Sequence, residues 1–163
     1  MPHTADPLIA AGREILEQAL SDMRGCIAGA PPQALNWQPT GDDTNSLAVL
    51  AMHSLHSTRS WLSVALGAPL PGRDRPSEFR ATAEDVAALL ATIDGIERDC
   101  VMLLDDAVAP DWAAAQQTHP RPAEDGPSHV AAAWAFLHAL EHLREHVGQM
   151  LLTRQLWDAA QTA

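Results

Sequence analysis

The amino-acid sequence predicts an all-α protein, a four-helix bundle that occupies a single domain, residues 1–163. A chain of 163 residues is long enough for one domain with a proper hydrophobic core. Its 12 prolines are confined to four regions, and because proline is poorly tolerated inside helices, four long proline-free segments remain. No stretch shows the sustained alternation of apolar and polar residues that is typical of strands. Four helices packed face to face are the simplest fold for this pattern.

The first proline-free segment is expected to form a helix from Pro7 to about Ala28. Asp6 is a favourable N-cap, and a proline at the first helical position has a backbone angle already suited to a helix. Gly29 follows the segment and is typical of a helix end. The apolar residues of this segment mark one stripe: Leu8, Ile9, Ile15, Leu16, Leu20, Met23 and Ile27.

The second segment is expected to form a helix over about 44–66. It should stop at Gly67, because glycine commonly ends helices and Pro69 follows closely. The residues that share one face of this helix are expected to pack into the bundle: Leu47, Leu50, Ser54, Ser57, Trp61 and Val64.

The third helix is expected to begin after Thr82 as its N-cap. Glu84 and Asp85 follow, and acidic residues are favourable in the first turn of a helix because of its dipole. The helix should continue through a series of apolar residues: Val86, Leu89, Leu90, Ile93, Ile96, Val101 and Leu104.

The fourth helix, over about 128–160, is expected to be buried on two sides, since its charged residues occupy only a narrow sector. One side is rich in large apolar residues: Phe136, Leu140, Leu143, Val147 and Leu151. The other carries small residues and histidines: Ala131, Ala135, Ala139, His142, His146 and Thr153. We expect the alanine-rich side to face the interior, where small residues leave room for a metal and a substrate. The leucine-rich side then packs elsewhere in the bundle or against another subunit.

Histidines on the second and fourth helices form a candidate metal site. His142 and His146 are four residues apart, so their imidazoles lie on one helical face and can bind the same ion. His53 lies at the edge of the core-facing stripe and is a better third ligand than His56, roughly 60° further round. His138 with His142 is an alternative pair at the same spacing. Three protein ligands leave positions open for water or substrate, as in catalytic rather than structural sites.

Five short motifs follow one another along almost the whole chain. They are LNWQP at 35–39, SLAVLAMH at 46–53, Trp61 eight residues after His53, RDRPSEF at 73–79 and HLREHVGQ at 142–149. In this order and spacing the sequence resembles the DinB/YfiT-like family of small bacterial helical proteins. The 73–79 run is expected to form a loop that closes one end of the bundle, where Arg73 or Arg75 can bind an anionic ligand.

The resemblance implies a four-helix bundle with up-down-down-up topology. It also implies a metal held by one histidine of the second helix and two residues four apart in the last helix. Those positions fall on His53, His142 and His146, and all three are histidine here. His56 and His138 are not part of the shared set.

Family members with an assigned activity use their metal with a low-molecular-weight thiol, in S-transferase or isomerase reactions. The resemblance therefore implies a metal-dependent transferase of this kind. A divalent ion stabilises a thiolate at neutral pH, or lowers the pKa of bound water toward about 7, so either can act as the nucleophile. Neutral imidazoles suit zinc or nickel, and iron is also compatible with them.

Other functions stay open. The protein can be a non-catalytic metal-binding or dimerising helical protein related to stress, or a small-molecule binding module. It can also be a metal-dependent hydrolase, because residues 142–146 fit the His-x-x-Glu-His pattern of inverted zinc peptidases with Glu145 as the base. That match is short, and no clear third carboxylate ligand follows. The histidines lack the Glu-x-x-His motifs of a di-iron bundle.

Composition limits the partners and the compartment. Lys and Arg number 10 against 21 Asp and Glu, a formal charge of -11, so nucleic acid is not an expected partner. No apolar run reaches the roughly 18 residues of a membrane span, and the N-terminus lacks a signal pattern. Cys26 and Cys100 lie in apolar stretches, as free thiols do in a reducing cytoplasm. We expect a cytoplasmic homodimer, with Leu143, Val147 and Leu151 at a two-fold interface.

Overall fold

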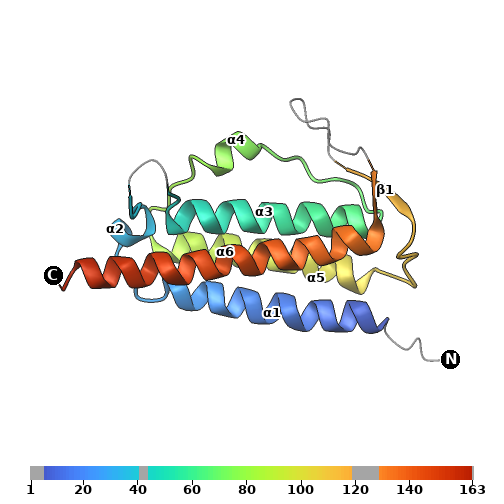
Figure 1. Ribbon diagram of the computed structural model, residues 1–163, viewed down its shortest axis with the longest axis horizontal. Helices are drawn as coiled ribbons and strands as arrows, with labels where there is room; N and C mark the ends of the chain where they lie inside the picture. The colour runs from blue at the N-terminus through green and yellow to red at the C-terminus, as the bar shows by residue number, and fades with distance from the viewer. Residues whose placement is uncertain (1–5, 41–43, 119–128, 163) are drawn as a thin grey trace.

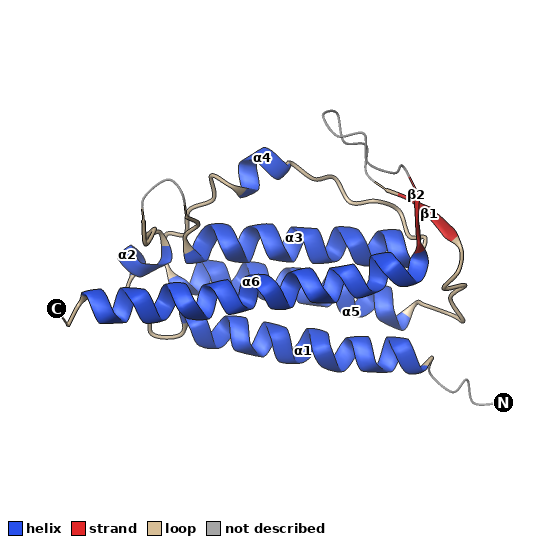
Figure 2. Ribbon diagram, viewed as in Figure 1, coloured by secondary structure: helices blue, strands red, loops and turns tan. Residues whose placement is uncertain are grey.

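The chain folds into four long helices, joined by two one-turn helices and two short strands (Figure 1). The computed structural model describes residues 6–40, 44–118 and 129–162. The long helices are α1 (Pro7–Ile27), α3 (Leu47–Ala65), α5 (Val86–Asp105) and α6 (Ala132–Ala160). The short elements are α2 (Pro32–Leu35), α4 (Arg75–Glu78), β1 (Ala115–Gln117) and β2 (His129–Ala131). The expected four-helix bundle is confirmed, and Figure 2 shows how far helix dominates the fold.

The four helices have the expected up-down-down-up topology. α1 and α6 run in one direction and α3 and α5 in the other, as the colour gradient of Figure 1 shows. α6 packs against α3 and α1, and α5 packs against the same two helices. Because α3 and α5 are parallel, the connection between them, residues 66–85, has to return along the bundle. This crossover carries α4 past the flank of α3 (Figure 1).

Three of the long helices begin at a side-chain cap. Asp6 accepts hydrogen bonds from the first amides of α1, Ser46 from α3 and Asp85 from α5. Each cap satisfies an N–H group that has no partner within its helix. The expectation that Thr82 caps the third helix is wrong, because Asp85 accepts the N–H of Ala88 and α5 starts directly after this cap.

The predicted ends of the first two helices are confirmed. Gly29 and Gly67 have φ values of 65° and 64°, in the left-handed region that only glycine adopts at little cost. α1 and α3 end just before these residues, at Ile27 and Ala65.

A two-stranded antiparallel pairing at the start of α6 was not predicted. β1 pairs with β2, with Ala115 opposite Ala131 and Gln117 opposite His129. The fourth helix, expected from about Ser128, therefore begins at Ala132, directly after β2. Ser128 itself lies outside the described residues. A pairing of three residues on each side is too short to give a recognisable strand pattern in the sequence.

α6 is buried on two sides, as its sequence predicts. Ala135 and Ala139 on one side, and Leu143 and Val147 on the other, are all buried within the single chain. The expectation that Leu143 and Val147 find partners in a second subunit is therefore wrong, since α6 packs against both α3 and α1. Leu151 is the exception, because it remains 43% exposed. No helix in the described part of the chain is long and apolar enough to cross a membrane.

The contact between α1 and α6 depends on a glycine. A β-carbon built on Gly12 would lie 2.2 Å from Cζ of Phe136, far inside van der Waals contact. Phe136 is almost fully buried, so its ring fills the space that the missing side chain leaves. Gly12 therefore sets how closely the two helices approach.

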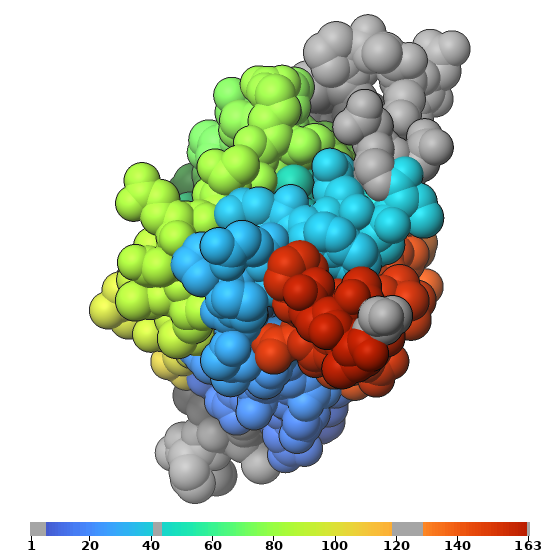
Figure 3. Space-filling view, turned by 90° about the vertical axis from the view of Figure 1, so that its left-hand side faces the viewer, coloured from blue at the N-terminus to red at the C-terminus, as the bar shows by residue number. Residues whose placement is uncertain are grey.

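One end of the bundle is closed by the segment between α1 and α3. Figure 3 looks at this end and shows the segment lying between the crossover and the last turns of α6. The rings of Trp37 and Trp157 meet edge to face, with centroids 5.6 Å apart. The amide of Asn36 donates to the carbonyl of Ala83 and accepts from its N–H, at 2.8 and 2.9 Å. The LNWQP motif thus ties both α6 and the crossover to this end.

Candidate metal centre

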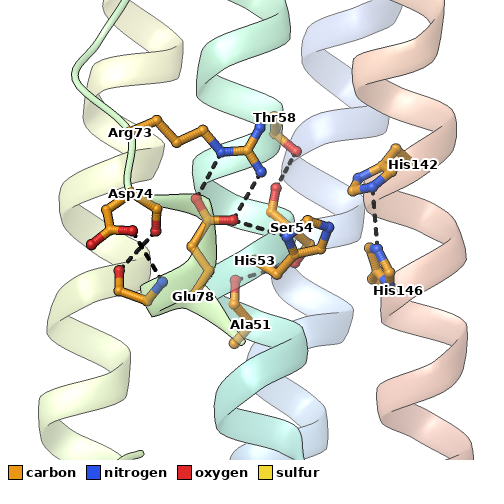
Figure 4. Close-up of polar contacts among 10 residues, drawn as sticks. Ala51, His53, Ser54, Thr58, Arg73, Asp74, Glu78, His142 and His146 are labelled. Carbon is orange, nitrogen blue, oxygen red and sulfur yellow. Dashed lines mark hydrogen bonds and ion pairs between the residues drawn. The ribbon is translucent and has the colours of Figure 1, made fainter. Parts of the chain in front are cut away.

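Three histidines from two helices converge on one point. His53 comes from α3, and His142 and His146 come from successive turns of α6. The ring centroid of His53 lies 5.1 Å from each of the other two, which are 4.4 Å apart. One nitrogen of each ring lies within 4.8 Å of the others, close enough to hold a single metal ion. Figure 4 shows His53 facing the two histidines of α6.

The spacing of the ring nitrogens fits a shared ion. Nε2 of His142 and Nε2 of His146 are 3.2 Å apart. Two nitrogens that each lie 2.0–2.1 Å from zinc in tetrahedral geometry are about 3.3–3.4 Å apart. The same separation also suits a hydrogen bond between two neutral imidazoles. The α6 pair therefore needs almost no rearrangement to bind an ion.

The environment keeps His142 and His146 neutral. Burial lowers the pKa of His142 to about 3, with a further contribution from the charges that His146, His53 and His138 would carry. Burial also lowers the pKa of His146, although its hydrogen bond to Gln149 acts in the opposite direction. Only the neutral imidazole has a lone pair for a metal, so both rings are in the ligating form at neutral pH.

His142 carries a buried polar atom that the surrounding protein does not satisfy. Its Nδ1 has no hydrogen-bond partner among the described residues. An unsatisfied buried group costs on the order of 1–3 kcal/mol. With an ion at Nε2, this Nδ1 would carry the proton of the ring and still have no acceptor, so ligation at Nε2 does not remove the cost.

Gln149 orients the ring of His146. Nδ1 of His146 donates to Oε1 of Gln149 at 2.9 Å, and the Gln149 amide in turn donates to Glu145 at 3.4 Å. With the proton on Nδ1, the lone pair is on Nε2, which faces His142. Gln149, the last residue of the HLREHVGQ motif, therefore has a physical role in the site.

Glu78 orients the ring of His53 in the same way. This role of Glu78 was not predicted from the sequence. Nδ1 of His53 donates to Oε2 of Glu78 at 2.9 Å. Arg73 donates to both oxygens of the same carboxylate, from Nε at 2.7 Å and from a terminal nitrogen at 2.9 Å. Burial raises the pKa of Glu78, but the hydrogen bonds from Arg73 and His53 outweigh it and hold the pKa below its usual range.

Comparison with known proteins shows which family the chain belongs to. A family model described as the DinB superfamily matches residues 15–150. The chain belongs to the DinB superfamily. Its fold is similar to that in a structure titled "Crystal structure of the conserved protein of locus from Enterococcus faecalis", with a TM-score of 0.69 and 17% sequence identity. The match covers 90% of this chain and 95% of that one. A search of curated proteins found no match.

His138 and His56 of this DinB protein lie outside the cluster of three. His138 stacks on Trp134 at 4.7 Å and meets the edge of Trp61 at 4.9 Å. Its ring centroid is 5.6 Å from that of His142, so it borders the site. His56 is half-buried on α3, and burial lowers its pKa. Neither joins the group of nitrogens that can hold one ion.

The expectation that the 73–79 run closes one end of the bundle is wrong. It lies beside the middle of α3 and reaches the site from the flank (Figure 1 and Figure 4). Arg73 is engaged by Glu78, and the guanidinium of Arg75 lies 5.0 Å from the ring of Phe79. Both arginines therefore have partners within the run itself. A signal that could have indicated such local pairing in advance is the presence of two arginines and two acids within these seven residues.

Proposed function

We propose that this DinB protein binds one divalent metal ion through His53, His142 and His146 and acts as a metal-dependent transferase with a low-molecular-weight thiol. The observation that carries the proposal is the convergence of three imidazole nitrogens within 4.8 Å, two of them on rings with lowered pKa values. Bound there, the ion would supply a stabilised thiolate or a water with a pKa near 7. Neutral imidazoles suit zinc or nickel, and also iron.

The chain's own thiols support an external thiol substrate. Cys26 and Cys100 are its two cysteines, and both are free and buried. Burial raises the pKa of Cys26 to about 11 and that of Cys100 to about 12, so both are protonated and enclosed at neutral pH. Thiol chemistry at this site therefore needs a thiol from solution.

Different residues of the chain have different roles at this site. Gln149 and Glu78 hold the Nδ1 protons of His146 and His53, which leaves the Nε2 lone pairs for the ion. With three protein ligands, the ion keeps positions for a thiol or a water. His138, Trp134 and Trp61 form an aromatic border beside His142, where part of a substrate can rest.

A metal-dependent hydrolase is a weaker candidate. In the His-x-x-Glu-His reading, Glu145 acts as the base for a bound water. Glu145 is exposed, and its carboxylate accepts a hydrogen bond from Gln149. The alternative of a non-catalytic metal-binding protein uses the same three histidines and differs only in turnover.

Metal analysis followed by an activity screen tests the proposal. Protein purified without a histidine tag or added metal should contain about one divalent ion per chain. The metal-loaded form should then consume a small thiol together with a model electrophile, and the metal-free form should not. A chain that binds metal but turns over no thiol supports the non-catalytic alternative, and a chain that binds no metal contradicts the proposal as a whole.

We also propose that the protein is a cytoplasmic homodimer. Since Leu143 and Val147 are buried in the single chain, the interface has to use other residues. The outward side of α6 offers large exposed apolar residues for it: Leu137, Leu151, Leu152 and Leu156. Symmetric pairing of such a surface is the commonest form of assembly among soluble proteins.

A further inference from the structure

Glu78 is a buried carboxylate in an otherwise exposed segment. It is the only buried residue of α4, with 4% of its surface exposed, whereas residues 74–77 and 79–80 are exposed. Burying a carboxylate is costly unless charged and hydrogen-bonding partners compensate. Here Arg73 donates two hydrogen bonds and His53 donates one. These three hydrogen bonds offset the cost of burial and hold the acid against a candidate metal ligand.

We propose that Glu78, clamped by Arg73, is the positioning residue that makes His53 a metal ligand. An ionised carboxylate can only accept hydrogen bonds, so its contact with Nδ1 of His53 fixes the proton on that atom. The lone pair is then on Nε2, the ring nitrogen on the side away from Glu78. This inference rests on the proposed metal site, which it deepens by naming what prepares that site.

The geometry of the segment suits such a role. Asp74 accepts the N–H of Ser77 at 3.2 Å and so fixes the turn that presents Glu78. The two-pronged contact from Arg73 sets the plane of the carboxylate, which a single contact would leave free to rotate. The ring of Phe79 lies 4.5 Å from that of His53 and supports it from the same side. We call residues 73–79 the strap.

Charge gives the strap a second effect on the site. The three ligand candidates are imidazoles, which carry no negative charge, so they offer no countercharge to a divalent ion. Glu78 is the acid in direct contact with one of them, and a carboxylate behind a ligating imidazole raises the basicity of that ligand. Arg73 balances the negative charge of Glu78 when no ion is present, so the buried pair is stable both with and without a bound metal ion.

The coupling also runs in the opposite direction. If Glu78 strengthens metal binding by some factor, metal binding strengthens the seating of Glu78 by the same factor. The strap should therefore open less often when the ion is bound. Its backbone hydrogen bonds report this, because the amides of Ser77, Glu78 and Arg80 all donate within the turn.

A first measurement needs no metal. In the metal-free wild type, ¹⁵N NMR of the imidazoles should show His53 in a single Nδ1–H tautomer. Glu78→Gln should lose this preference, since an amide can accept from Nδ1–H or donate to a bare Nδ1 with similar ease. Glu84→Gln is the matched control, because it removes one charge from an exposed acid in the same crossover and should leave the tautomer unchanged.

A second measurement is metal affinity by competition with a chromophoric chelator, using Zn²⁺ as the probe. Glu78→Gln should weaken binding about 10- to 100-fold, the usual effect of losing such an outer partner. Glu84→Gln should stay within about twofold of the wild type. Zn²⁺ should also slow amide hydrogen exchange in the strap of the wild type, and not in that of Glu78→Gln.

A third variant guards against simple misfolding. Glu78→Asp keeps the charge that pairs with Arg73 but is one methylene shorter. It therefore distinguishes two possible roles of Glu78: an ion pair that only holds the strap in place, and the contact that orients His53. It should lose the tautomer and the affinity as Glu78→Gln does. Wild-type tautomer and affinity in Glu78→Asp and Glu78→Gln would overturn the inference while leaving the metal site intact. A wild type that binds no Zn²⁺ overturns the proposed function and, with it, the role assigned to Glu78, whatever the tautomer shows.

Discussion

Removing His53 should separate a true three-histidine site from a chance cluster. In His53→Ala, two ring nitrogens remain, 3.2 Å apart on α6, and no ligand is left on α3. Structural zinc sites with four ligands bind with roughly 10–16 kcal/mol, or about 3 kcal/mol per ligand. Losing one ligand should therefore weaken binding on the order of 100-fold.

The matched control is His56→Ala. His56 lies three residues further along the same helix and is half-buried, but it is not among the nitrogens that converge. Its substitution should leave metal affinity within about twofold of the wild type. Both variants also need a stability measurement, since Glu78 loses one partner in His53→Ala and keeps its two bonds to Arg73.

The assay is competition between the untagged protein and a chromophoric chelator for Zn²⁺, with metal content measured after dialysis. Single substitutions of His142 and His146 by alanine should give losses similar to that of His53→Ala. If His53→Ala kept full affinity while His56→Ala lost it, the ligand set would be wrong. Equal small losses in all four variants would indicate scattered surface binding in place of one site.

Three further predictions concern pH, packing and assembly. Because the pKa of His142 is lowered to about 3, the unfolded chain takes up a proton below pH 6.5 that the folded metal-free chain does not, so stability should fall as pH drops from about 6.5 to 3. The slope for this proton is at most about 1.4 kcal/mol per pH unit, and urea unfolding of His142→Leu should show a flatter dependence. Metal affinity should fall only where the ligand histidines of the folded chain take up protons, which for His142 is near pH 3. Gly12→Ala should destabilise the protein by about 1–3 kcal/mol in thermal unfolding, since a β-carbon there meets Phe136 at 2.2 Å, whereas Gly25→Ala, with nothing within 4 Å, should gain up to about 1 kcal/mol. Sedimentation equilibrium should show twice the 17.5 kDa chain mass, and Leu152→Glu should return it to 17.5 kDa without loss of metal; a wild type at 17.5 kDa contradicts the dimer.

Local signals explain why the helices could be predicted. The cap at Asp6 and the stops at Gly29 and Gly67 act within a few residues of the chain, and each occurs where the sequence placed it. The start of α5 was misplaced because Thr82 and Asp85 are both good caps, and only the packed structure shows which of them accepts an amide. The β1–β2 pairing joins segments from either side of a long connection, so no local sequence pattern predicts it.

The faces of α6 show the limit of a periodicity argument. Helical spacing correctly grouped Leu143 with Val147 and His142 with His146. It could not say what covers each group, because that depends on how many neighbours a helix has. In the structure α6 has two, α3 and α1, so both groups are covered within one chain. The predicted interface at Leu143 and Val147 failed for this reason, whereas the predicted convergence of the histidines did not depend on it.

The difference between His53 and Glu78 shows why ligands can be read from a sequence more easily than the residues that prepare them. A pair four residues apart is fixed by the helix itself, and His53 could be added because it lies at the edge of the stripe that the sequence marks as core-facing. Glu78 reaches His53 across 25 residues of chain, from a one-turn helix whose position depends on the course of the crossover. Nothing within α4 predicts that its acid should be buried. Burying this acid costs stability unless its partners compensate for the lost hydration. A bundle selected only for stability would carry an apolar residue at this position, so a buried acid in contact with His53 is a physical argument that this part of the α3–α6 contact is kept for binding.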